Sequence, residues 1–456
     1  MTPHLVRTPG SADARLDWVD RMALDTMNIT IFALGTRGDI QPDLALAVGL
    51  QHAGHRVTLV APYNFAPWIR SYGVTAHPVQ FSLQEFMQKP EVKAALKSRS
   101  ILRQMRMMRD EMGSGIMEAV EEFWQASQDA DFVIQTSSAH GAVDIARERN
   151  IPMAFVFLQP LAPPTRAFPS FLLPFRFSLG SHYNYLTHVL IWRAGWPAVG
   201  GPLNRWRAAR FNLPPWRSAT EMFNARRGFG TPWLYAFSPD VVPKPAEWDE
   251  HHHVTGYWFL DPPPDWQPPP ELERFLEDGP PPVYVGFGSM SHEDPERQTC
   301  LALRALELAG QRGVLSTGWG GITRLPASPT VFYVDDVPHS WLFPRIAAVV
   351  HHGGAGTTAE SLRAGVPSIV SPFGVDQYAW AEQVARLGVG VRAAPIKKLT
   401  AEKLAEAIRS TVHDTALRAK AAALGEQIRA ENGIARAVDV IERHADEWSR
   451  RREAKP

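Results

Sequence analysis

The sequence contains a single cysteine, Cys300, among 456 residues. One cysteine excludes an internal disulfide framework and any metal cluster built from several thiolates. Such scarcity is typical of proteins of the reducing cytoplasm. We therefore expect a cytoplasmic protein that is stabilised by packed apolar cores, which a chain of this length can bury.

Long apolar runs are also missing. No stretch reaches the roughly 18 uncharged apolar residues of a membrane-spanning helix, and residues 1–27 lack the apolar segment of a signal peptide. We predict that residues 1–27 form a flexible extension. The aromatic-rich segment 168–216 is too interrupted by Pro, Arg and His to span a membrane. Peripheral membrane association stays open as an alternative for this segment.

Neither sign of charge is in excess. Lys plus Arg and Asp plus Glu both number 47, so the formal net charge is zero. This balance gives no support for a nucleic-acid partner, because such proteins usually carry a strongly basic surface. Hydrophobic residues make up 45% and charged residues 21% of the chain, which is the composition of a soluble globular protein.

What the sequence does have is an alternation of short apolar runs and helix-like stretches. NITIFAL (28–34) ends at a glycine turn, the helix-like residues 42–53 follow, and RVTLVA (56–61) is a second apolar run. This strand–helix–strand order is the unit of an open parallel sheet. Similar runs lie at 132–135, 153–157, 283–289, 313–317, 330–334, 347–352 and 368–373, with helical stretches at 83–127, 296–309 and over about the last 55 residues.

The middle of the chain changes character. Prolines and tryptophans crowd between 160 and 270, and DPPPDWQPPP (261–270) is typical of a linker stiffened by polyproline II. The sequence thus predicts an α/β fold of two doubly wound, Rossmann-like domains facing across a cleft, with ligands beyond the carboxyl ends of the strands. The predicted parts are an amino-terminal domain 28–245, a linker 246–282, a carboxyl-terminal domain 283–435 and a final helix 436–456 that packs back toward the amino-terminal domain.

Residues 349–365, VVHHGGAGTTAESLRAG, pass from a strand through a glycine-rich turn into a helix expected to start at Thr357 and to end at Gly365. Free N–H groups and the positive end of a helix dipole at such a turn bind phosphate. No Lys follows the glycines, so this is not a Walker A loop, and a merely tight turn stays open. A metal site on His351 and His352 is disfavoured, because adjacent strand residues point apart and no further ligand stands at zinc-like spacing.

Three other strand ends carry polar residues. GTRGDIQP (35–42) follows the first strand, and its Asp39 is either a general base in the cleft or a cap of the next helix. SPFGVDQ (371–377) ends in Asp376 and Gln377, whose mixed acceptors and donors suit sugar hydroxyls. GFGSMS (286–291) offers another small loop with the hydroxyl of Ser289.

Together and in this order, these motifs resemble those of the nucleotide-sugar glycosyltransferases with two Rossmann-like domains, the GT-B architecture. The likeness covers about residues 28–440 and is closest to the family 1 branch of sterol glucosyltransferases and glycopeptide-antibiotic glycosyltransferases. Its most specific segment is HHGGAGTTAESLRAGVPSIVSPFGVDQ (351–377). The other matching segments are GTRGDIQP, GPPPVYVGFGSM (279–290), GVLSTGWGG (313–321) and VPHSWLFPR (337–345).

The resemblance implies a role for each candidate residue. It implies that the donor diphosphate is held by His352, Gly353, Gly354, Gly356, Thr357 and Ser289, with Thr36 and Arg37 near the phosphates. It implies that Glu360 holds the ribose hydroxyls, that Val337 and His339 lie at the nucleobase, and that Asp376 and Gln377 hold the transferred sugar.

The resemblance also implies a reaction. It would be inverting, metal-independent transfer of a hexose from a nucleotide sugar, UDP-glucose by family likeness, with no cofactor. Asp39 would be the base, with His140 in reserve, because the first loop lacks the histidine that plant relatives use. The apolar segment 168–216 suggests a large hydrophobic acceptor such as a sterol, terpenoid, polyketide or lipid. A dTDP-deoxysugar transferase, a nucleotide-sugar 2-epimerase and a non-catalytic nucleotide-sugar binder stay open as alternatives.

Overall fold

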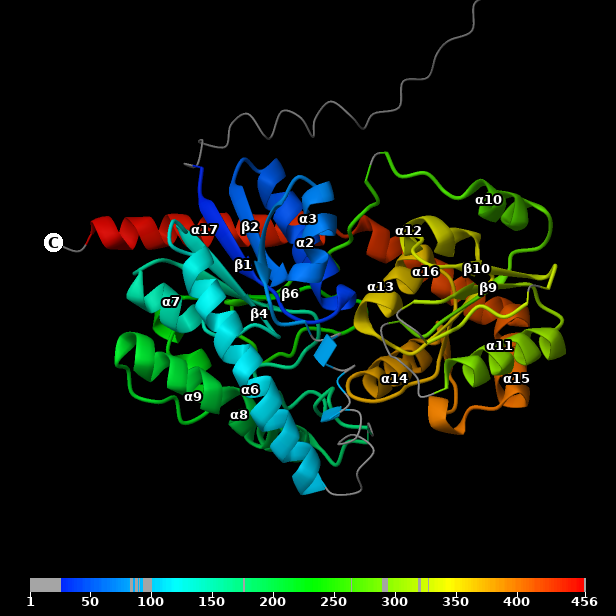
Figure 1. Ribbon diagram of the computed structural model, residues 1–456, viewed down its shortest axis with the longest axis horizontal. Coiled ribbons are helices and arrows are strands. Elements are labelled where there is room, and N and C mark those ends of the chain that lie inside the picture. Colours follow the sequence, from blue (N-terminus) through cyan, green and yellow to red (C-terminus); the bar gives the residue numbers. More distant parts are fainter. Residues whose placement is uncertain are drawn as a thin grey trace, which may run out of the picture.

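The computed structural model describes residues 26–82, 85–86, 89, 91–92, 101–174, 177–263, 265–288, 294–318, 321–326 and 328–454, with the backbone alone for 101–112 and 114. The predicted extension 1–27 therefore lies almost wholly outside the described residues. Two sheets covered by helices lie beside each other (Figure 1). Their strand orders are β3-β2-β1-β4-β5-β6-β7 and β10-β9-β8-β11-β12-β13. All strand pairs are parallel, so the predicted pair of doubly wound domains is confirmed.

The amino-terminal domain has seven described strands. They are β1 (Asn28–Phe32), β2 (Arg56–Pro62), β3 (Thr75–Val79), β4 (Phe132–Thr136), β5 (Met153–Phe157), β6 (Trp233–Tyr235) and β7 (His252–Val254). The helices are α2 (Arg37–His52), α3 (Ala66–Ser71), α6 (Ile101–Ala126), α7 (Ala142–Glu148), α8 (Ser181–Phe211) and α9 (Ala219–Asn224), with 3-10 turns at Tyr63–Phe65 and Arg227–Phe229.

The carboxyl-terminal domain follows the same plan. Its strands are β8 (Val283–Gly286), β9 (Gly313–Ser316), β10 (Val331–Val334), β11 (Ala348–His351), β12 (Ser368–Val370) and β13 (Gly390–Arg392). The helices are α10 (Pro270–Glu277), α11 (Pro295–Ala309), α12 (His339–Leu342), α13 (Ala355–Ala364), α14 (Gln377–Leu387), α15 (Ala401–His413), α16 (Thr415–Ala430) and α17 (Gly433–Glu453), with 3-10 turns at Phe343–Arg345 and Ile396–Lys398.

The start of α2 differs from the prediction. The sequence places a helix at 42–53 because Pro is favoured at the first helical position, yet α2 begins at Arg37 and carries Pro42 inside it. The N-cap is Thr36, and the Asp39 side chain accepts a hydrogen bond from the Thr36 N–H at 2.8 Å. This capping arrangement starts the helix five residues early. As a result, Asp39 lies in the first turn of α2.

The predicted domain boundaries also need correction. The predicted amino-terminal domain ends at 245, but β7 pairs with β6 and belongs to its sheet. The predicted linker 246–282 contains α10, whose Leu272 is fully buried against Tyr284 and Leu342 of the carboxyl-terminal domain. The connection between the domains is therefore shorter than the prolines suggest, because both of its ends are packed onto a domain.

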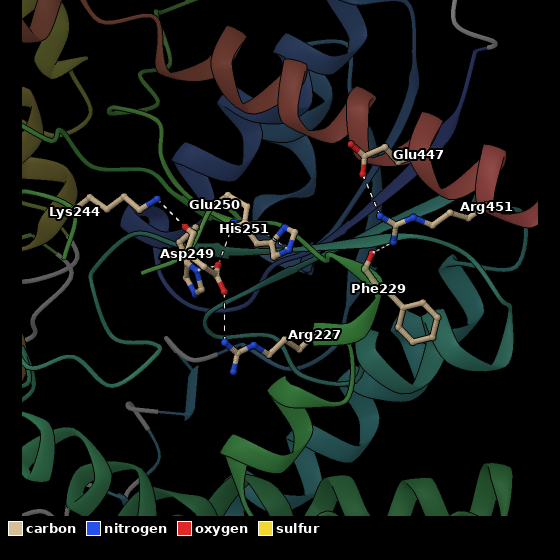
Figure 2. A network of polar contacts seen from close by, with 9 residues as sticks. Arg227, Phe229, Lys244, Asp249, Glu250, His251, Glu447 and Arg451 are labelled. Carbon is tan, nitrogen blue, oxygen red and sulfur yellow. Dashed lines mark hydrogen bonds and ion pairs between the residues drawn. The ribbon is translucent and has the colours of Figure 1, made fainter. Parts of the chain in front are cut away.

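The last helix, α17, returns to the amino-terminal domain (Figure 1). Its Ala437 and Ile441 are fully buried in one core with Leu44 of α2. Near its end, Arg451 donates a hydrogen bond to the Phe229 carbonyl at 3.1 Å and lies 3.5 Å from Glu447. Figure 2 shows this contact beside a second group of polar contacts. The carboxyl-terminal end of the described chain is thus fixed to the amino-terminal sheet.

The second group in Figure 2 surrounds Asp249, three residues before the first residue of β7. The Asp249 carboxylate lies 3.6 Å from the Arg227 guanidinium and accepts a hydrogen bond from the His251 N–H at 3.1 Å. Its carbonyl accepts a hydrogen bond from Lys244 at 2.8 Å. These contacts position the edge strand β7. No helix in the described part of the chain is long and apolar enough to cross a membrane.

Candidate active site

The turn between β11 and α13 has the geometry of an anion site. Gly353 has φ +94°, and a Cβ there would stand 2.8 Å from Val370 Cγ1, so a side chain does not fit. The helix begins at Ala355, two residues before the predicted start at Thr357. The N–H groups of residues 355–357 have no partner within the helix, and they lie at the positive end of its dipole.

The two adjacent histidines have different surroundings. His351 is fully buried, and its Nδ1 accepts a hydrogen bond from the Gly353 N–H at 3.1 Å. The His352 ring lies between two glycines, because a Cβ on either Gly288 or Gly354 would come within 2.6 Å of a ring atom. Burial lowers the pKa of His352 to about 4, so this imidazole is neutral near pH 7. A neutral hydrogen-bonding ring thus stands beside the anion site.

Asp39 is held by the helix cap but keeps one oxygen available. Its Oδ2 accepts hydrogen bonds from the Thr36 N–H at 2.8 Å and from the Thr36 hydroxyl at 3.1 Å. Across the described residues no hydrogen bond to its Oδ1 is found. Burial raises the pKa of Asp39, while the two bonds from Thr36 lower it. The capping alternative is therefore realised, and the geometry still allows Asp39 to accept a proton.

Asp39 and Asp376 come from different domains and lie close enough to interact. Burial raises the pKa of Asp376 to about 6, and the charge of Asp39 adds to this shift. Asp376 Oδ2 accepts a hydrogen bond from Trp380 Nε1 at 3.1 Å and another from Gln159 Nε2 at 3.4 Å. Gln159 follows β5 of the amino-terminal domain. Asp376 is therefore bonded to the amino-terminal domain through Gln159, within electrostatic range of Asp39.

The domains also meet through their main chains. A Cβ on Gly356 would lie 3.8 Å from the carbonyl oxygen of Gly38, so the first turns of α2 and α13 are in contact. Pro42, four residues after Gly38, has no N–H and leaves this carbonyl without its helical partner. The contact thus sets a backbone acceptor in α2 next to the start of α13.

Gln377 is buried and partly used within its own loop. Its Oε1 accepts hydrogen bonds from the Phe373 N–H at 2.8 Å and the Gly374 N–H at 3.2 Å. Its amide nitrogen is the group left to meet a ligand. The loop also holds Val375 at φ +52°, an uncommon conformation for a β-branched residue. Strain of this kind is often found at ligand-binding loops.

Arg37 connects the first loop to the carboxyl-terminal domain. Its guanidinium lies 2.6 Å from Asp336 and 4.9 Å from the centroid of the Trp68 ring. The two charged side chains are 36% and 69% exposed, so the ion pair adds little to stability. Burial lowers the pKa of His339 to about 3, and the charges of Arg37 and His352 contribute. Arg37 therefore lies near the segment predicted to hold the nucleobase.

That segment is fixed by aromatic contacts. The His339 ring stacks on Phe343, with 4.3 Å between centroids, and its Nε2 shares a hydrogen bond of 3.2 Å with the Tyr284 hydroxyl. Val337, two residues earlier, is half-buried. A planar base can extend such a stack.

Glu360 is a buried carboxylate with few partners. It is 5% exposed, and its Oε2 has no hydrogen-bond partner within the described chain. Arg363 Nη1 lies 4.0 Å away, while Arg363 Nη2 donates to Asp261 at 3.0 Å. Burial raises the pKa of Glu360 to about 7, against the lowering effect of Arg363. A buried acceptor without a donor is costly, and a ligand hydroxyl would supply one.

Two further predicted residues, Ser289 and His140, have no described contact with the candidate site. Ser289 lies outside the described residues. His140 follows β4 in a loop that is tied to the first loop, because the Ser138 hydroxyl bonds to the Leu34 carbonyl. Burial lowers the pKa of His140 to about 4. No hydrogen bond joins His140 to Asp39 in the part of the chain described.

The aromatic segment 168–216 divides into two parts. Phe171 is buried and meets the Trp380 ring edge to face at 5.3 Å, so this part reaches the partner of Asp376. In contrast, Leu186 and Leu190 are more than half exposed. The inner part therefore lies beside the candidate site, and the outer part does not contribute to it.

Sequence reasoning missed Gln159 and Asp336. Gln159 stands two residues after β5, and Asp336 stands two residues after β10. Both positions follow the carboxyl end of a parallel strand, where ligand-binding residues gather in doubly wound sheets. Applying this rule to every strand, and not only to glycine-rich ends, would have found them.

Two family matches cover parts of the two domains. Residues 29–158 match the glycosyltransferase family 28 N-terminal domain. Residues 320–442 match the C-terminal domain described as erythromycin biosynthesis protein CIII-like. The first match contains Asp39, and the second contains the whole β11–α13 turn.

Curated relatives include sterol 3-beta-glucosyltransferases. The chain is 36% identical over 444 residues to the enzyme of Aspergillus terreus, a match covering 94% of this chain and 31% of that protein. It is also 36% identical to the enzyme of Cryptococcus neoformans var. neoformans, covering 92% and 27%. The chain thus spans about a third of the length of the curated relatives it matches.

Solved structures of antibiotic glycosyltransferases share the fold. The glycotransferase of kitacinnamycin superimposes with a TM-score of 0.67 at 22% identity, covering 92% of this chain and 100% of that chain. A calicheamicin glycosyltransferase gives 0.65 at 21% identity, covering 92% and 98%. The chain belongs to the GT-B glycosyltransferases, in the family 1 branch of sterol 3-beta-glucosyltransferases and antibiotic glycosyltransferases.

Proposed function

We propose that the chain transfers a hexose from a nucleoside diphosphate sugar to a hydroxyl of a large hydrophobic acceptor, with inversion at the anomeric carbon and without a metal. The observation that carries this proposal is the contact between the first turn of α2, which holds Asp39, and the start of α13. One domain brings a carboxylate that can accept a proton, and the other brings an anion site. Transfer between two bound substrates needs both groups at one place.

The donor half of the mechanism rests on the start of α13. The N–H groups of residues 355–357 and the His352 ring would bind the diphosphate and stabilise the charge that it gains as it leaves. Glu360 would accept hydrogen bonds from the ribose hydroxyls. Asp376 and the Gln377 amide nitrogen would hold hydroxyls of the sugar. Fixed dipoles of this kind need no metal to neutralise the leaving group.

The acceptor half rests on Asp39. An ordinary carboxylate, with a pKa of about 4, cannot ionise an alcohol in advance. Proton transfer to Asp39 must therefore occur late, together with formation of the bond between the acceptor oxygen and the anomeric carbon. Burial, which raises the pKa of Asp39, makes the carboxylate a better acceptor at that moment.

The names of relatives guide the choice of substrates. Sterol 3-beta-glucosyltransferases at 36% identity favour a glucosyl donor, UDP-glucose by family likeness, and a sterol-like acceptor. A dTDP-deoxysugar is the second candidate donor, since a glycosyltransferase of Streptomyces sp. SF2575 with the same fold was solved with thymidine diphosphate, at a TM-score of 0.57 and 18% identity.

A donor and acceptor panel tests the function. UDP- and dTDP-hexoses are combined with sterols, polyketide aglycones and long-chain alcohols, in EDTA, and products are followed by mass spectrometry. We expect nucleoside diphosphate release that depends on the acceptor, and a product of inverted anomeric configuration by NMR. Formation of a 2-epimer of the donor, or binding without any release, would contradict the proposal.

Asp39→Asn tests the base. The Asn oxygen can still accept the Thr36 N–H bond, so the cap of α2 should survive. We expect turnover to fall by about a thousandfold or more, within the range for loss of a general base, while the Kd for the donor changes less than about threefold. Near-normal turnover would exclude Asp39 as the base and direct attention to His140.

His352→Ala tests the diphosphate contact. Loss of one donor to a developing anion costs about 3 kcal/mol, or about a hundredfold in rate. We expect this loss in kcat together with weaker nucleotide binding by calorimetry. His352→Gln, which keeps a side-chain N–H, should recover part of both. Unchanged UDP affinity in the Ala variant would remove His352 from the phosphate site.

Glu360→Gln separates binding from stability. The folded pKa of Glu360, about 7, lies above its ordinary value of 4.5, so its ionisation destabilises the fold as pH rises from 4.5 to 7. In urea unfolding we expect the Gln variant to be more stable than the parent by about 3 kcal/mol at pH 8 and by less than about 1 kcal/mol at pH 5. Donor binding should weaken more at pH 8, where Glu360 is ionised, than at pH 5, where it is protonated. A variant that is less stable at pH 8 would refute this account.

A further inference from the structure

The beginning of α8 has its polar and apolar sides reversed. A helix on a protein surface normally turns its apolar side inward and its polar side to water. In α8 the polar residues Asn184, Thr187 and His188 are buried, at 4%, 7% and 0% exposure. Each has a hydrogen-bond partner in the preceding segment. The partners are, in that order, the Arg166 carbonyl, the Ser170 N–H and the Phe168 carbonyl.

The opposite side of the same turns is apolar and exposed. Leu186 and Leu190, one helical turn apart, are 53% and 56% exposed, and Tyr185 beside them is 40% exposed. The preceding segment adds Phe177 at 53% and Leu179 at 74%. These five residues are called the α8 patch, and they are most of the large hydrophobic side chains exposed in the described residues. Exposure of so many apolar side chains to water is unfavourable, so the α8 patch indicates a contact with another apolar surface.

Positive charge surrounds the α8 patch. The sequence has no Asp or Glu from Asn150 to Thr220, but it has seven arginines there. Arg193 is exposed three residues beyond Leu190. The Arg166 guanidinium lies over the Tyr185 ring at 5.3 Å.

Acidic side chains from other elements reach this segment only away from the patch residues, within the part of the chain that the structure describes. Glu247 accepts hydrogen bonds from the Thr165 hydroxyl and the Arg166 N–H. Farther along α8, Arg207 and Arg210 are paired with Asp144 and Glu121. The Arg166 guanidinium lies within electrostatic range of Glu247, and no described contact gives the Arg193 guanidinium an acidic partner.

We propose that the α8 patch docks on a bilayer surface that contains anionic lipid. Leu186, Leu190 and Leu179 would enter the boundary between headgroups and acyl chains. Tyr185 would lie at the polar interface, as aromatic residues prefer. Arg166 and Arg193 would reach lipid phosphates with their charged ends. The exposed leucines favour an apolar partner and the arginines favour an anionic one. A bilayer that contains anionic lipid provides both.

A second copy of the chain fits this surface less well. A symmetric dimer sets the same patch against itself. It would bring Arg166 and Arg193 of one copy near those of the other, and like charges across an interface oppose association. The docking inference does not depend on which sugar or acceptor is used, although it would bring the proposed site to a membrane-dissolved acceptor.

Vesicle sedimentation tests the inference. The whole chain is mixed with vesicles of phosphatidylcholine alone or with about 30% phosphatidylserine, and the bound fraction is measured. We expect binding to the anionic vesicles that weakens with salt. Leu186→Glu with Leu190→Glu should abolish binding. Arg166→Gln with Arg193→Gln should weaken binding to anionic vesicles by about thirtyfold.

Ala416→Glu with Ala419→Glu is the matched control. These residues are exposed on α16, in the other domain, and the change adds the same charge as the leucine variant. The control should bind vesicles like the parent, and thermal unfolding should be alike for all variants because every altered side chain is exposed. Equal vesicle binding by the leucine variant and the parent would overturn the inference. So would a parent that ignores vesicles and forms a dimer, by light scattering, that the leucine variant loses. Either result leaves the transferase assay as an independent test of the proposed function.

Discussion

The contact between the first turns of α2 and α13 is the constraint on which the candidate site depends. It requires two main chains to approach with little between them, at Gly38 and Gly356. It also requires Asp39 to fold back on its own cap. Gly35 permits this, because at φ +128° a Cβ would come within 2.4 Å of Asp39 Oδ2. Small residues in both loops therefore decide where the carboxylate and the anion site meet.

Because the contact depends on small residues, the glycines in the sequence were enough to locate the candidate site. The strands β1 and β11 were predictable because they are buried runs, and glycine follows each of them. From those two facts the parallel sheets and the position of the β11–α13 turn follow. The start of α2 did not follow, because Pro42 imitates a first helical residue while the true start uses the side-chain bonds between Thr36 and Asp39. Helix propensity is a property of single residues, whereas this cap depends on the bonds between two residues, Thr36 and Asp39.

Other features could not be predicted from the sequence, because the residues that contact each other are far apart in the chain. Gln159 becomes meaningful only when it reaches Asp376, and Arg37 only when it reaches Asp336. The strand β7 is three residues long and contains two histidines, so no pattern of strand residues marks it. The reversed sides of α8 were also beyond prediction, since the partners that make burial of Asn184 tolerable come from a loop before the helix. Long-range contacts set each of these features, and local sequence does not encode them.

The electrostatics of the junction suit a reaction in which charge moves. Burial raises the pKa of Asp39, Asp376 and Glu360, and lowers the pKa of His339, His351 and His352. Desolvation at the junction thus disfavours both negative and positive charge.

A nearby anion raises the pKa of a histidine, so charge growing on the proposed leaving diphosphate would raise the pKa of His352 and strengthen their hydrogen bond. An interaction that is stronger in the transition state than with bound substrate lowers the barrier, whereas a histidine already charged would bind substrate and product tightly as well. Under the proposed mechanism, burial of a neutral His352 between Gly288 and Gly354 therefore favours turnover over tight donor binding.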